Sequence, residues 1–448
     1  MDTLLYVALY MQKGLEKMIT STPTQDVYFI PSSIENGFLV YSPLRKMLFW
    51  ANSSASEAIN AHLNNGLDLP IENTKLVENV NKINKKNIAP PREQRLKIGD
   101  RAVFILSQKC NLSCTYCYAQ VSRSPDTINE KQLATVINYI LSSPSNKEKE
   151  FSFLGGGEPT ITWDIFTNAI EYIKKEATKR KVKYSIGLTT NATLLNDERV
   201  SWLKQYHVDV GVSFDILPEI QNAQRCFPYE SDKNSFDIVN SCIQLLIAYK
   251  MPPRIRSTIT PLNVCLMEEM VAYVVNNYPD IKKLHFEHVT DLQLHQNEYY
   301  DNFISNFFIA RDYARENGIY LRNSLVRSVN RIKGRFCNGE FCVLPTGEIV
   351  SCHRVSSQKD RLFNEFMYGH INDTININEK AFHTVNENIH NKPSECSNCF
   401  AQWHCAGICP YIRKFLNSAQ LSDYCEFAKK MITRELDSKV IKFLHITN

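Results

Sequence analysis

Strand-like and helix-like segments alternate six times along the middle of the chain, and this order limits the fold more than any other feature. The runs that predict strands are Ala102–Ser107, Glu150–Leu154, Lys183–Thr189, Val208–Phe214, Arg254–Thr260 and Lys283–Val289. Helix-like segments lie between them, and apolar residues recur at spacings of three and four in Lys131–Leu141, Trp163–Lys179 and Phe236–Tyr249. Such alternating units predict an α/β fold with a parallel sheet.

A cysteine triplet follows the first predicted strand. Cys110, Cys114 and Cys117 are spaced C-x3-C-x2-C. Three thiolates on one tight loop can hold three irons of a 4Fe-4S cluster and leave the fourth iron open to a non-protein ligand. A structural zinc site needs four ligands, and no fourth Cys or His lies near the triplet in the sequence. Buried free thiols are the other alternative, because Cys often serves as a small apolar core residue.

A glycine-rich segment, Gly155-Gly156-Gly157-Glu158-Pro159, ends the second predicted strand. The glycines allow backbone groups to approach a ligand closely, and the Glu158 carboxylate is available to an ammonium group. Taken alone this is a weak signal, since most glycine-rich strand ends are only turns.

The two motifs together resemble the radical S-adenosylmethionine (SAM) superfamily, whose signature is C-x3-C-x-aromatic-C followed by a GGEP segment. Tyr116 supplies the aromatic residue, and Gly156, Gly157, Glu158 and Pro159 match the second element. The resemblance implies that SAM chelates the open iron and that the GGEP segment binds its amine. It also implies that one-electron reduction cleaves SAM to a 5'-deoxyadenosyl radical, which abstracts a substrate hydrogen.

The resemblance further implies a partial (β/α)6 barrel, which places ligands at the carboxyl ends of its strands. Residues at those ends are Cys110, Gly156, Thr190, Asn191, Ser213 and Asp215. Thr190–Leu195 looks like the family's TNGTLL segment, with Ala192 replacing the glycine, and Val212–Asp215 looks like its V-S-I-D strand end. We therefore expect Asn191, Ser213 and Arg225 to bind SAM, and Asp215 to be a candidate catalytic residue. The alternatives are a turn for Asn191, a strand hydroxyl for Ser213 and a surface charge for Arg225.

Eight cysteines gather near the C-terminal end of the chain. They are Cys337, Cys342, Cys352, Cys396, Cys399, Cys405, Cys409 and Cys425. Eight soft ligands suit two four-cysteine sites, which can hold either iron-sulfur clusters or zinc.

The spacing of these cysteines is similar to the SPASM domain of radical SAM peptide-modifying enzymes, which implies two auxiliary 4Fe-4S clusters and three clusters in all. The ligand sets implied are Cys337, Cys342, Cys352 and Cys409 for one, and Cys396, Cys399, Cys405 and Cys425 for the other. If Cys342 does not bind, the first auxiliary cluster can accept a substrate thiolate.

The first part of the chain predicts a small α+β domain. Asp26–Pro31, Gly37–Ser42 and Lys46–Ala51 predict three strands, and Ser54–Glu57 predicts a capping box that opens a helix ending at Gly66. A second helix is predicted over Glu72–Ile83, and residues 84 to 97 predict a linker.

This order resembles the winged-helix-like recognition domain found ahead of many maturases of ribosomally made peptides (RiPPs). A leader peptide would then add as a strand to the sheet edge. The alternative is a cap that packs on the barrel. We expect three domains, over residues 1 to 97, 98 to 325 and 326 to 448.

Two functions within the family compete. A peptide maturase would form a thioether or carbon-carbon crosslink in a precursor peptide that carries a leader. An anaerobic sulfatase maturase would oxidise Cys or Ser to formylglycine, and that class has an acid where this chain has His353, directly after Cys352. His353 is a candidate catalytic residue because imidazole accepts a proton near neutral pH. Both enzymes need an electron donor such as flavodoxin or ferredoxin. A third hypothesis is a non-catalytic electron carrier or zinc scaffold, which needs no SAM site.

Composition sets further limits. Of 14 cysteines, 11 belong to the expected clusters, which leaves Cys226, Cys242 and Cys265 as expected core thiols rather than a disulfide framework. The apolar run Leu4–Met11 is too short to span a bilayer. With 51 basic and 47 acidic residues and no basic run, nothing points to nucleic acid or a membrane, and we expect a cytoplasmic protein.

Overall fold

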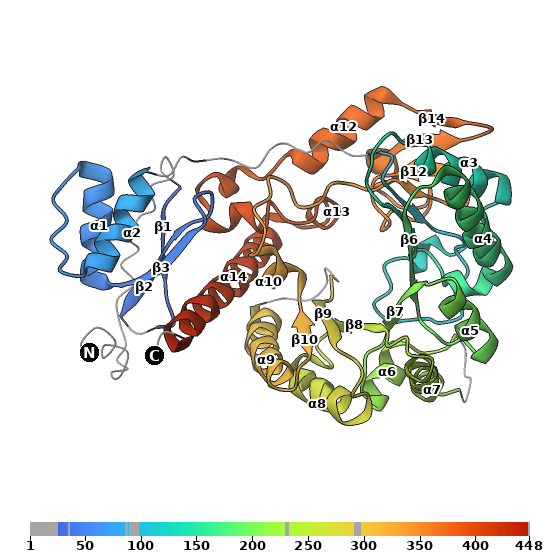
Figure 1. Cartoon of the computed structure of the whole chain (residues 1–448), viewed down its shortest axis with the longest axis horizontal. Helices are drawn as coiled ribbons and strands as arrows, with labels where there is room; N and C mark the ends of the chain where they lie inside the picture. The colour runs from blue at the N-terminus through green and yellow to red at the C-terminus, as the bar shows by residue number, and fades with distance from the viewer. Residues whose placement is uncertain are drawn as a thin grey trace.

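The computed structural model describes residues 26–34, 36–85, 88, 98–228, 233–290 and 297–446. Leu4–Met11 and most of the predicted linker lie outside these ranges. Figure 1 shows a small N-terminal sheet at one end of the molecule, the large curved sheet at the other, and the C-terminal segment between them. No helix in the described ranges has the length and apolar character that a membrane span requires.

Seven parallel strands in chain order form the curved part of the large sheet. They are β4 (Arg101–Phe104), β5 (Lys149–Phe153), β6 (Tyr184–Thr190), β7 (Asp209–Ser213), β8 (Arg254–Ile259), β9 (Lys283–His288) and β10 (Tyr320–Arg322). The first six overlap the six predicted strands, so the parallel α/β prediction is confirmed. β10 was not predicted.

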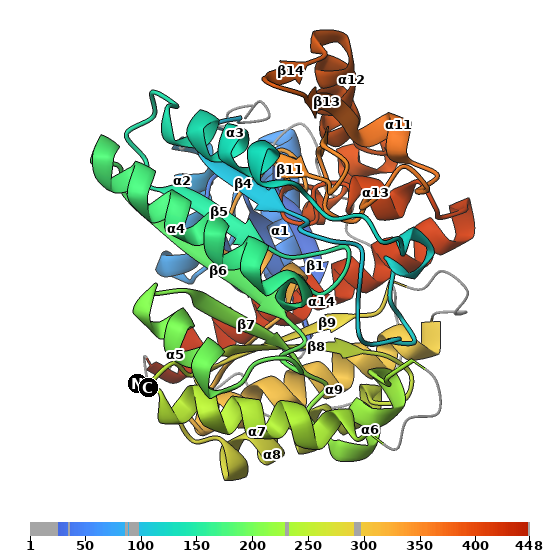
Figure 2. The ribbon, with the colours of Figure 1, turned by 90° about the vertical axis from the view of Figure 1, so that its right-hand side faces the viewer.

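Helices cover the outer side of this sheet (Figure 2). They are α3 (Glu130–Leu141), α4 (Trp163–Arg180), α5 (Asp197–Gln205), α6 (Pro218–Gln224), α7 (Ser235–Ala248), α8 (Met267–Asn277) and α9 (Asn297–Glu316). α4 shows why the helices form where periodicity predicts them: Phe166, Ile170 and Ile173 recur on one face and are fully buried. Burial of each such side chain contributes about 1.5–3 kcal/mol to the free energy of folding.

The large sheet continues into the C-terminal part of the chain. β11 (Cys342–Val343) pairs parallel to β4, and β12 (Glu348–Val350), β13 (Met367–Ile371) and β14 (Ile375–Ile377) follow as antiparallel neighbours. The C-terminal helices are α10 (Ser324–Ser328), α11 (Phe363–Phe366), α12 (Glu379–His390), α13 (Pro410–Arg413) and α14 (Ser418–Ile446). Short 3-10 turns occupy Gln120–Ser122, Pro159–Thr162, Val264–Leu266, Ser394–Asn398 and Phe400–Trp403. β11, which contains Cys342, thus lies directly beside β4, the strand that leads into the cysteine triplet.

The N-terminal sheet consists of β1 (Tyr28–Pro31), β2 (Gly37–Ser42) and β3 (Met47–Asn52), in that order and antiparallel. Helices α1 (Ser53–Asn65) and α2 (Thr74–Lys85) pack on it through Ile59 and Val80. The predicted capping box is wrong, because the helix begins at Ser53 and the Asn52 side chain accepts a hydrogen bond from the Ala55 amide at 2.8 Å. Gly66 ends α1 at φ 67°, as predicted.

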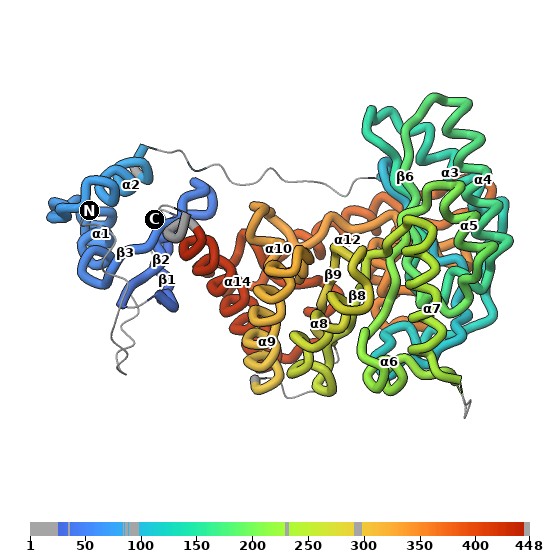
Figure 3. The backbone as a smooth tube through the Cα atoms, turned by 60° about the horizontal axis from the view of Figure 1, so that its bottom comes forward, coloured from blue at the N-terminus to red at the C-terminus, as the bar shows by residue number. Residues whose placement is uncertain are grey.

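This N-terminal sheet is attached to the C-terminal part of the chain by buried polar contacts. The Asp437 carboxylate on α14 accepts hydrogen bonds from the Ser32 hydroxyl at 2.7 Å and from the Ser33 amide at 3.0 Å. Tyr41 and His404 share a hydrogen bond of 2.5 Å between the phenol oxygen and Nε2. Figure 3 shows the sheet lying against the far end of α14.

Candidate SAM and iron-sulfur site

The cysteine triplet lies on the loop that leaves β4. Its backbone is anchored to the end of α6, because the Thr115 amide donates to the Gln224 carbonyl at 2.9 Å and the Ser113 amide to the Cys226 carbonyl at 2.8 Å. All three thiols are half-buried. Burial raises the pKa of the Cys114 thiol to about 12, although Arg225 opposes the rise. A metal that binds these sulfurs must therefore displace their protons.

Arg123 joins the triplet to the glycine-rich segment. Its guanidinium donates to the Cys117 sulfur at 3.5 Å and to the Gly156 carbonyl at 2.9 Å. The sequence analysis did not single out this arginine. Its position, six residues after the last cysteine of the triplet, is a signal that could have identified it. The structure thus brings together the two motifs predicted to form one site.

The glycine-rich segment runs directly against the start of the cysteine loop. The Gly157 amide donates to the Ser107 carbonyl at 2.9 Å, and the Glu158 amide to the Lys109 carbonyl at 2.8 Å. A Cβ atom at Gly157 would lie 1.8 Å from the Lys109 carbonyl oxygen, and Gly156 has φ 60°. Only glycine fits such a close backbone approach, which is the arrangement expected of a ligand cradle.

Glu158 is fully engaged by protein donors. One carboxylate oxygen accepts from the Thr160 and Thr190 hydroxyls, both at 2.6 Å, and the other from the Asn191 amide at 2.7 Å. The side chain is buried, which raises its pKa. Glu158 therefore ties the end of β5 to the end of β6, and its direct contact with an ammonium group stays a prediction. The neighbouring Pro159 starts the short turn that follows.

Asp215 does not present a free carboxylate to a substrate. It accepts hydrogen bonds from the Tyr116 hydroxyl at 2.5 Å, from Arg225 Nε at 3.0 Å, and from Gln224 and the Thr258 amide, each at 3.0 Å. Asp215 and Arg225 are both buried, and the guanidinium lies 5.3 Å from the centre of the Tyr116 ring. These contacts pair the Asp215 carboxylate with Tyr116 and Arg225, and the catalytic role expected of Asp215 stays a prediction.

The remaining predicted SAM contacts lie at the same end of the sheet. The Asn191 side-chain amide donates to Oδ1 of Asn111 on the cysteine loop at 3.0 Å. Ser213 ends β7, half-buried, and no hydrogen bond of its hydroxyl is found within the described ranges. Ala192 has φ 64°, a conformation that favours the glycine found there in the family segment.

The first predicted set of C-terminal cysteines forms an electrostatic group. The pKa of Cys352 is raised by burial and by Cys409 and Cys337, and the pKa of Cys342 by burial, Glu340 and Cys352. Cys342 is fully buried in β11. The structure thus places Cys342 beside Cys352 and on the sheet that leads to the triplet.

The second predicted set also lies together, around the start of α14. Burial raises the pKa of Cys405 to about 12, and Cys425, Cys399 and Cys396 add to that rise. Among the described residues, no three or more His, Cys, Asp or Glu side chains converge as a single bound metal ion requires. Of the other cysteines, Cys242 lies in the core as expected, Cys226 is half-buried against the triplet loop, and Cys265 is exposed, so that prediction is wrong for Cys265.

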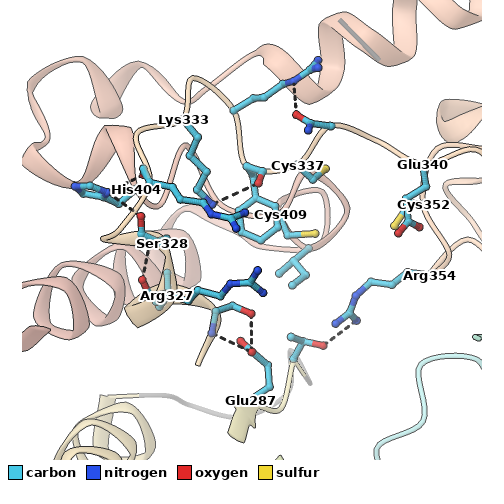
Figure 4. A pocket seen from close by; sticks show the side chains of 18 of the residues that line it. Glu287, Arg327, Ser328, Lys333, Cys337, Glu340, Cys352, Arg354, His404 and Cys409 are labelled. Carbon is cyan, nitrogen blue, oxygen red and sulfur yellow. Dashed lines mark hydrogen bonds between the residues drawn. The ribbon is translucent and has the colours of Figure 1, made fainter. Parts of the chain in front are cut away.

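A cavity of about 690 Å³ separates the barrel from the C-terminal cysteines. Its walls come from β8, β9, the segment from Ser324 to Glu340, and the C-terminal segment, and Cys337, Cys352 and Cys409 lie on it. Figure 4 shows Arg327 and Arg354 reaching into this space from opposite sides. The size and mixed lining suit a substrate segment.

His353 lies on this cavity wall and is oriented by a residue that the sequence analysis missed. The Glu340 carboxylate accepts hydrogen bonds from the His353 amide at 3.0 Å and from Nδ1 at 2.8 Å. His353 also packs edge-on against Tyr118, with ring centres 6.4 Å apart. Because Tyr118 follows Cys117, this contact links the triplet loop to the C-terminal cysteines.

Comparison with known proteins agrees with this geometry. Residues 104–273 match the sequence profile of the Radical SAM superfamily. The chain contains a radical SAM domain. The fold of such a domain implies that SAM and a 4Fe-4S cluster bind. In this structure the glycine segment lies beside three thiols at the carboxyl end of the sheet, an arrangement that fits both SAM and the cluster.

Three curated relatives extend the match. The radical SAM cyclopropyl synthase TigE of Paramaledivibacter caminithermalis is 22% identical over 92% of this chain and 89% of its own length. The cysteine-type anaerobic sulfatase-maturating enzyme of Clostridium perfringens is 25% identical over 72% of this chain and 92% of its own length. An uncharacterized protein of Methanocaldococcus jannaschii is 29% identical over 39% of this chain, a match that spans only 57% of the relative.

Among solved structures, anSMEcpe with bound AdoMet superposes with a TM-score of 0.64 at 21% identity, covering 78% of this chain and all of the other. This similarity establishes the radical SAM fold, with the cysteine-rich C-terminal part that was predicted. The chain therefore contains a radical SAM domain and is similar in sequence to a cyclopropyl synthase and to sulfatase-maturating enzymes.

Proposed function

We propose that this enzyme is a maturase of a ribosomally made peptide, in which it installs a thioether or carbon-carbon crosslink. The observation that supports this best is the link between the N-terminal sheet and the cavity. Tyr41 of β2 bonds to His404, and His404 lies on the cavity wall with Nδ1 3.1 Å from the Ser328 carbonyl. A leader peptide held on the N-terminal sheet would thus deliver its core segment to the cavity.

The geometry of the N-terminal sheet suits such a leader. β1 and β3 are its two edge strands, and an edge strand offers unpaired backbone groups to an added strand. Main-chain hydrogen bonds would supply affinity there, while the cavity would act on a separate part of the same peptide.

The roles of the cofactors follow from the same proposal. Cys110, Cys114 and Cys117 would ligate the SAM-binding cluster, with Gly156–Pro159, Asn191, Ser213 and Arg225 around SAM. Two further clusters on the eight C-terminal cysteines would accept the electron that leaves the substrate, and a flavodoxin or ferredoxin would supply the reducing electron. The bound SAM and cluster supply the hydrogen abstraction, and the protein supplies position and exclusion of water.

Two facts favour a peptide crosslink over formylglycine formation. TigE is named a cyclopropyl synthase, and its similarity covers 92% of this chain, against 72% for the sulfatase-maturating enzyme. The residue after Cys352 is His353 rather than an acid, and Glu340 holds it. A carboxylate base would accept a proton at this place in the sulfatase class, so an imidazole here departs from the pattern of that class.

The test is anaerobic reconstitution with iron and sulfide, followed by incubation with dithionite, SAM and synthetic peptides encoded by short reading frames beside the gene. We expect 5'-deoxyadenosine together with a peptide that has lost two hydrogens. Replacement of Cys110, Cys114 and Cys117 by Ala should abolish both products, whereas Cys265→Ala, at an exposed position, should leave them unchanged. A peptide in which a cysteine sulfur is replaced by oxygen with the loss of two hydrogens, or one in which a serine becomes an aldehyde that a hydrazine reagent traps, would support the sulfatase-type reaction instead. Zinc in place of iron, with no SAM cleavage, would contradict the enzyme proposal.

A further inference from the structure

The cavity beside the C-terminal cysteines carries an excess of positive charge. Six cationic side chains lie on its walls: Arg256, Arg327, Arg331, Lys333, Arg335 and Arg354. Arg335 donates hydrogen bonds to Asn338 and Asn386, and none of the other five forms an ion pair with a carboxylate in the described part of the chain. The two acids on the walls already have partners, since Glu287 bonds to His285 at 2.6 Å and Glu340 to His353 at 2.8 Å.

Two of the five cations have local roles that explain them. Lys333 lies near Cys337 and Cys405, so it offsets charge on those sulfurs. Arg354 donates to the Thr290 hydroxyl at 3.1 Å and stacks 5.1 Å from the centre of the Tyr118 ring. Arg256 lies close enough to Glu287 for its charge to help lower the pKa of that carboxyl. Arg327 and Arg331, whose side chains are exposed, have no such local role.

The neighbouring strands β8 and β10 add further arginine side chains close to the positive charge of the cavity. Strand pairing places Arg256 beside His285, and His285 beside Arg322. Burial lowers the pKa of Arg322, and the positive charges of Arg327, Arg254 and Arg256 lower it further. Of these, Arg254 is neutralised by Asp209 at 2.9 Å. Several guanidinium groups are therefore held close to one another, an arrangement that an anion would stabilise.

The geometry points to a carboxylate-binding site: we propose that Arg327 and Arg331, with Arg256, bind a carboxylate of the substrate peptide in this cavity. The inference rests on the proposed function and names the substrate class, a peptide with an acidic group near the modified residue. Guanidinium groups suit this ligand because their planar donors pair with both oxygens of a carboxylate. The carboxylate of SAM is a different ligand, because the residues assigned to SAM, Arg225 among them, do not line the cavity.

A carboxylate can come from an acidic side chain or from the C-terminus of the peptide. Three unlabelled, N-acetylated probes separate these sources: Gly-Ser-Glu-Ser-Gly amide, its Gln counterpart as an amide, and the Gln peptide with a free C-terminal carboxylate. Each is titrated into reconstituted enzyme with SAM, without reductant, and binding is read by isothermal titration calorimetry. We expect the Glu peptide, the free-acid peptide or both to bind about tenfold or more tightly than the neutral peptide, because charge-assisted hydrogen bonds are the stronger kind.

Arg327→Gln and Arg331→Gln should each reduce this preference for a carboxylate at least about fivefold, a loss typical of one charged hydrogen bond. The matched control is Arg315→Gln on α9, whose guanidinium is half exposed and pairs with Asp312; it should keep the full preference. Circular dichroism and iron content confirm that each variant is folded and loaded.

Equal affinity for the three probes, or no measurable binding of any, would overturn the inference, as would a preference that survives both substitutions. The binding assay needs no turnover. It therefore tests the carboxylate site, whereas the formation of 5'-deoxyadenosine and crosslinked peptide tests the proposed function.

Discussion

Gly157→Ala provides a sharp test of the contact between the glycine segment and the cysteine loop. The new Cβ would lie 1.8 Å from the Lys109 carbonyl oxygen and 2.6 Å from its carbonyl carbon. Real Cβ contacts begin near 3.0 Å, so the two backbones must separate by about 1.2 Å, the difference between 3.0 and 1.8 Å. Both atoms belong to the main chain, and no flexible side chain can give way.

This separation breaks the hydrogen bonds from the Gly157 and Glu158 amides, of 2.9 and 2.8 Å, to the Ser107 and Lys109 carbonyls. Two lost hydrogen bonds cost about 1 kcal/mol each, and forced displacement in a packed region costs about 1–3 kcal/mol more, so we expect a loss of about 3–5 kcal/mol in unfolding free energy. A shift of about 1 Å in the loop that carries Cys110 should also lower 5'-deoxyadenosine formation about a hundredfold.

Urea unfolding of the unloaded protein measures the first effect, and the rate of SAM cleavage by the reconstituted enzyme measures the second. Gly187→Ala is the matched control, because Gly187 lies in β6 and a Cβ there meets no atom within 4 Å. This control should be neutral or slightly stabilising. If Gly157→Ala matches the control in both stability and rate, the close backbone approach described above is not a feature of the folded protein.

Three further outcomes follow from buried charges. Arg225→Gln leaves the Asp215 carboxylate buried without its cation and should cost about 3–5 kcal/mol in urea unfolding, while the double change with Asp215→Asn should recover part of the loss. Burial raises the pKa of Asp26 to about 6 from its usual 3.8, so the stability that it contributes is present below about pH 4 and is lost as the pH rises through 6. Asp26→Asn should flatten that part of the pH profile of stability, and an unchanged slope would exclude Asp26 as its source. Asp437→Ala removes the acceptor of two serines of the N-terminal sheet, and limited proteolysis should then release that sheet faster, whereas an unchanged cleavage pattern would refute its docking role.

The barrel strands and helices were predictable because their signals are local. Apolar runs five to seven residues long and helix faces such as that of α4 appear within one window of sequence. β10, β11, β12 and β14 were missed because they are only two or three residues long, too short for an alternating pattern to stand out. Cysteine spacing likewise predicted two ligand sets, since soft ligands at short intervals have few other uses, and the assignment of these thiols to clusters stays a prediction.

The side chains that orient the site were harder to find. Glu340 lies 13 residues before His353, and only strand pairing brings the two together. We expected Asp215 to act on a substrate, because an acid at a strand end often does. Its carboxylate instead accepts a hydrogen bond from Arg225, which the sequence analysis assigned separately to SAM. Sequence patterns identify candidate functional side chains, whereas the hydrogen-bond and charge partners of those side chains depend on tertiary contacts.

The long helix α14 has a consequence for the length of any substrate. It carries Cys425 near one end and Asp437 twelve residues later, where the N-terminal sheet docks. At about 1.5 Å per residue, this rigid segment separates the two by about 18 Å. An extended peptide advances about 3.3 Å per residue, so about five or six residues are needed to cross that distance. Under the proposed function, a peptide that runs from the N-terminal sheet to the cavity, which Tyr424 of α14 lines, would have to cross about this distance, and peptides with a shorter spacer should bind without being modified.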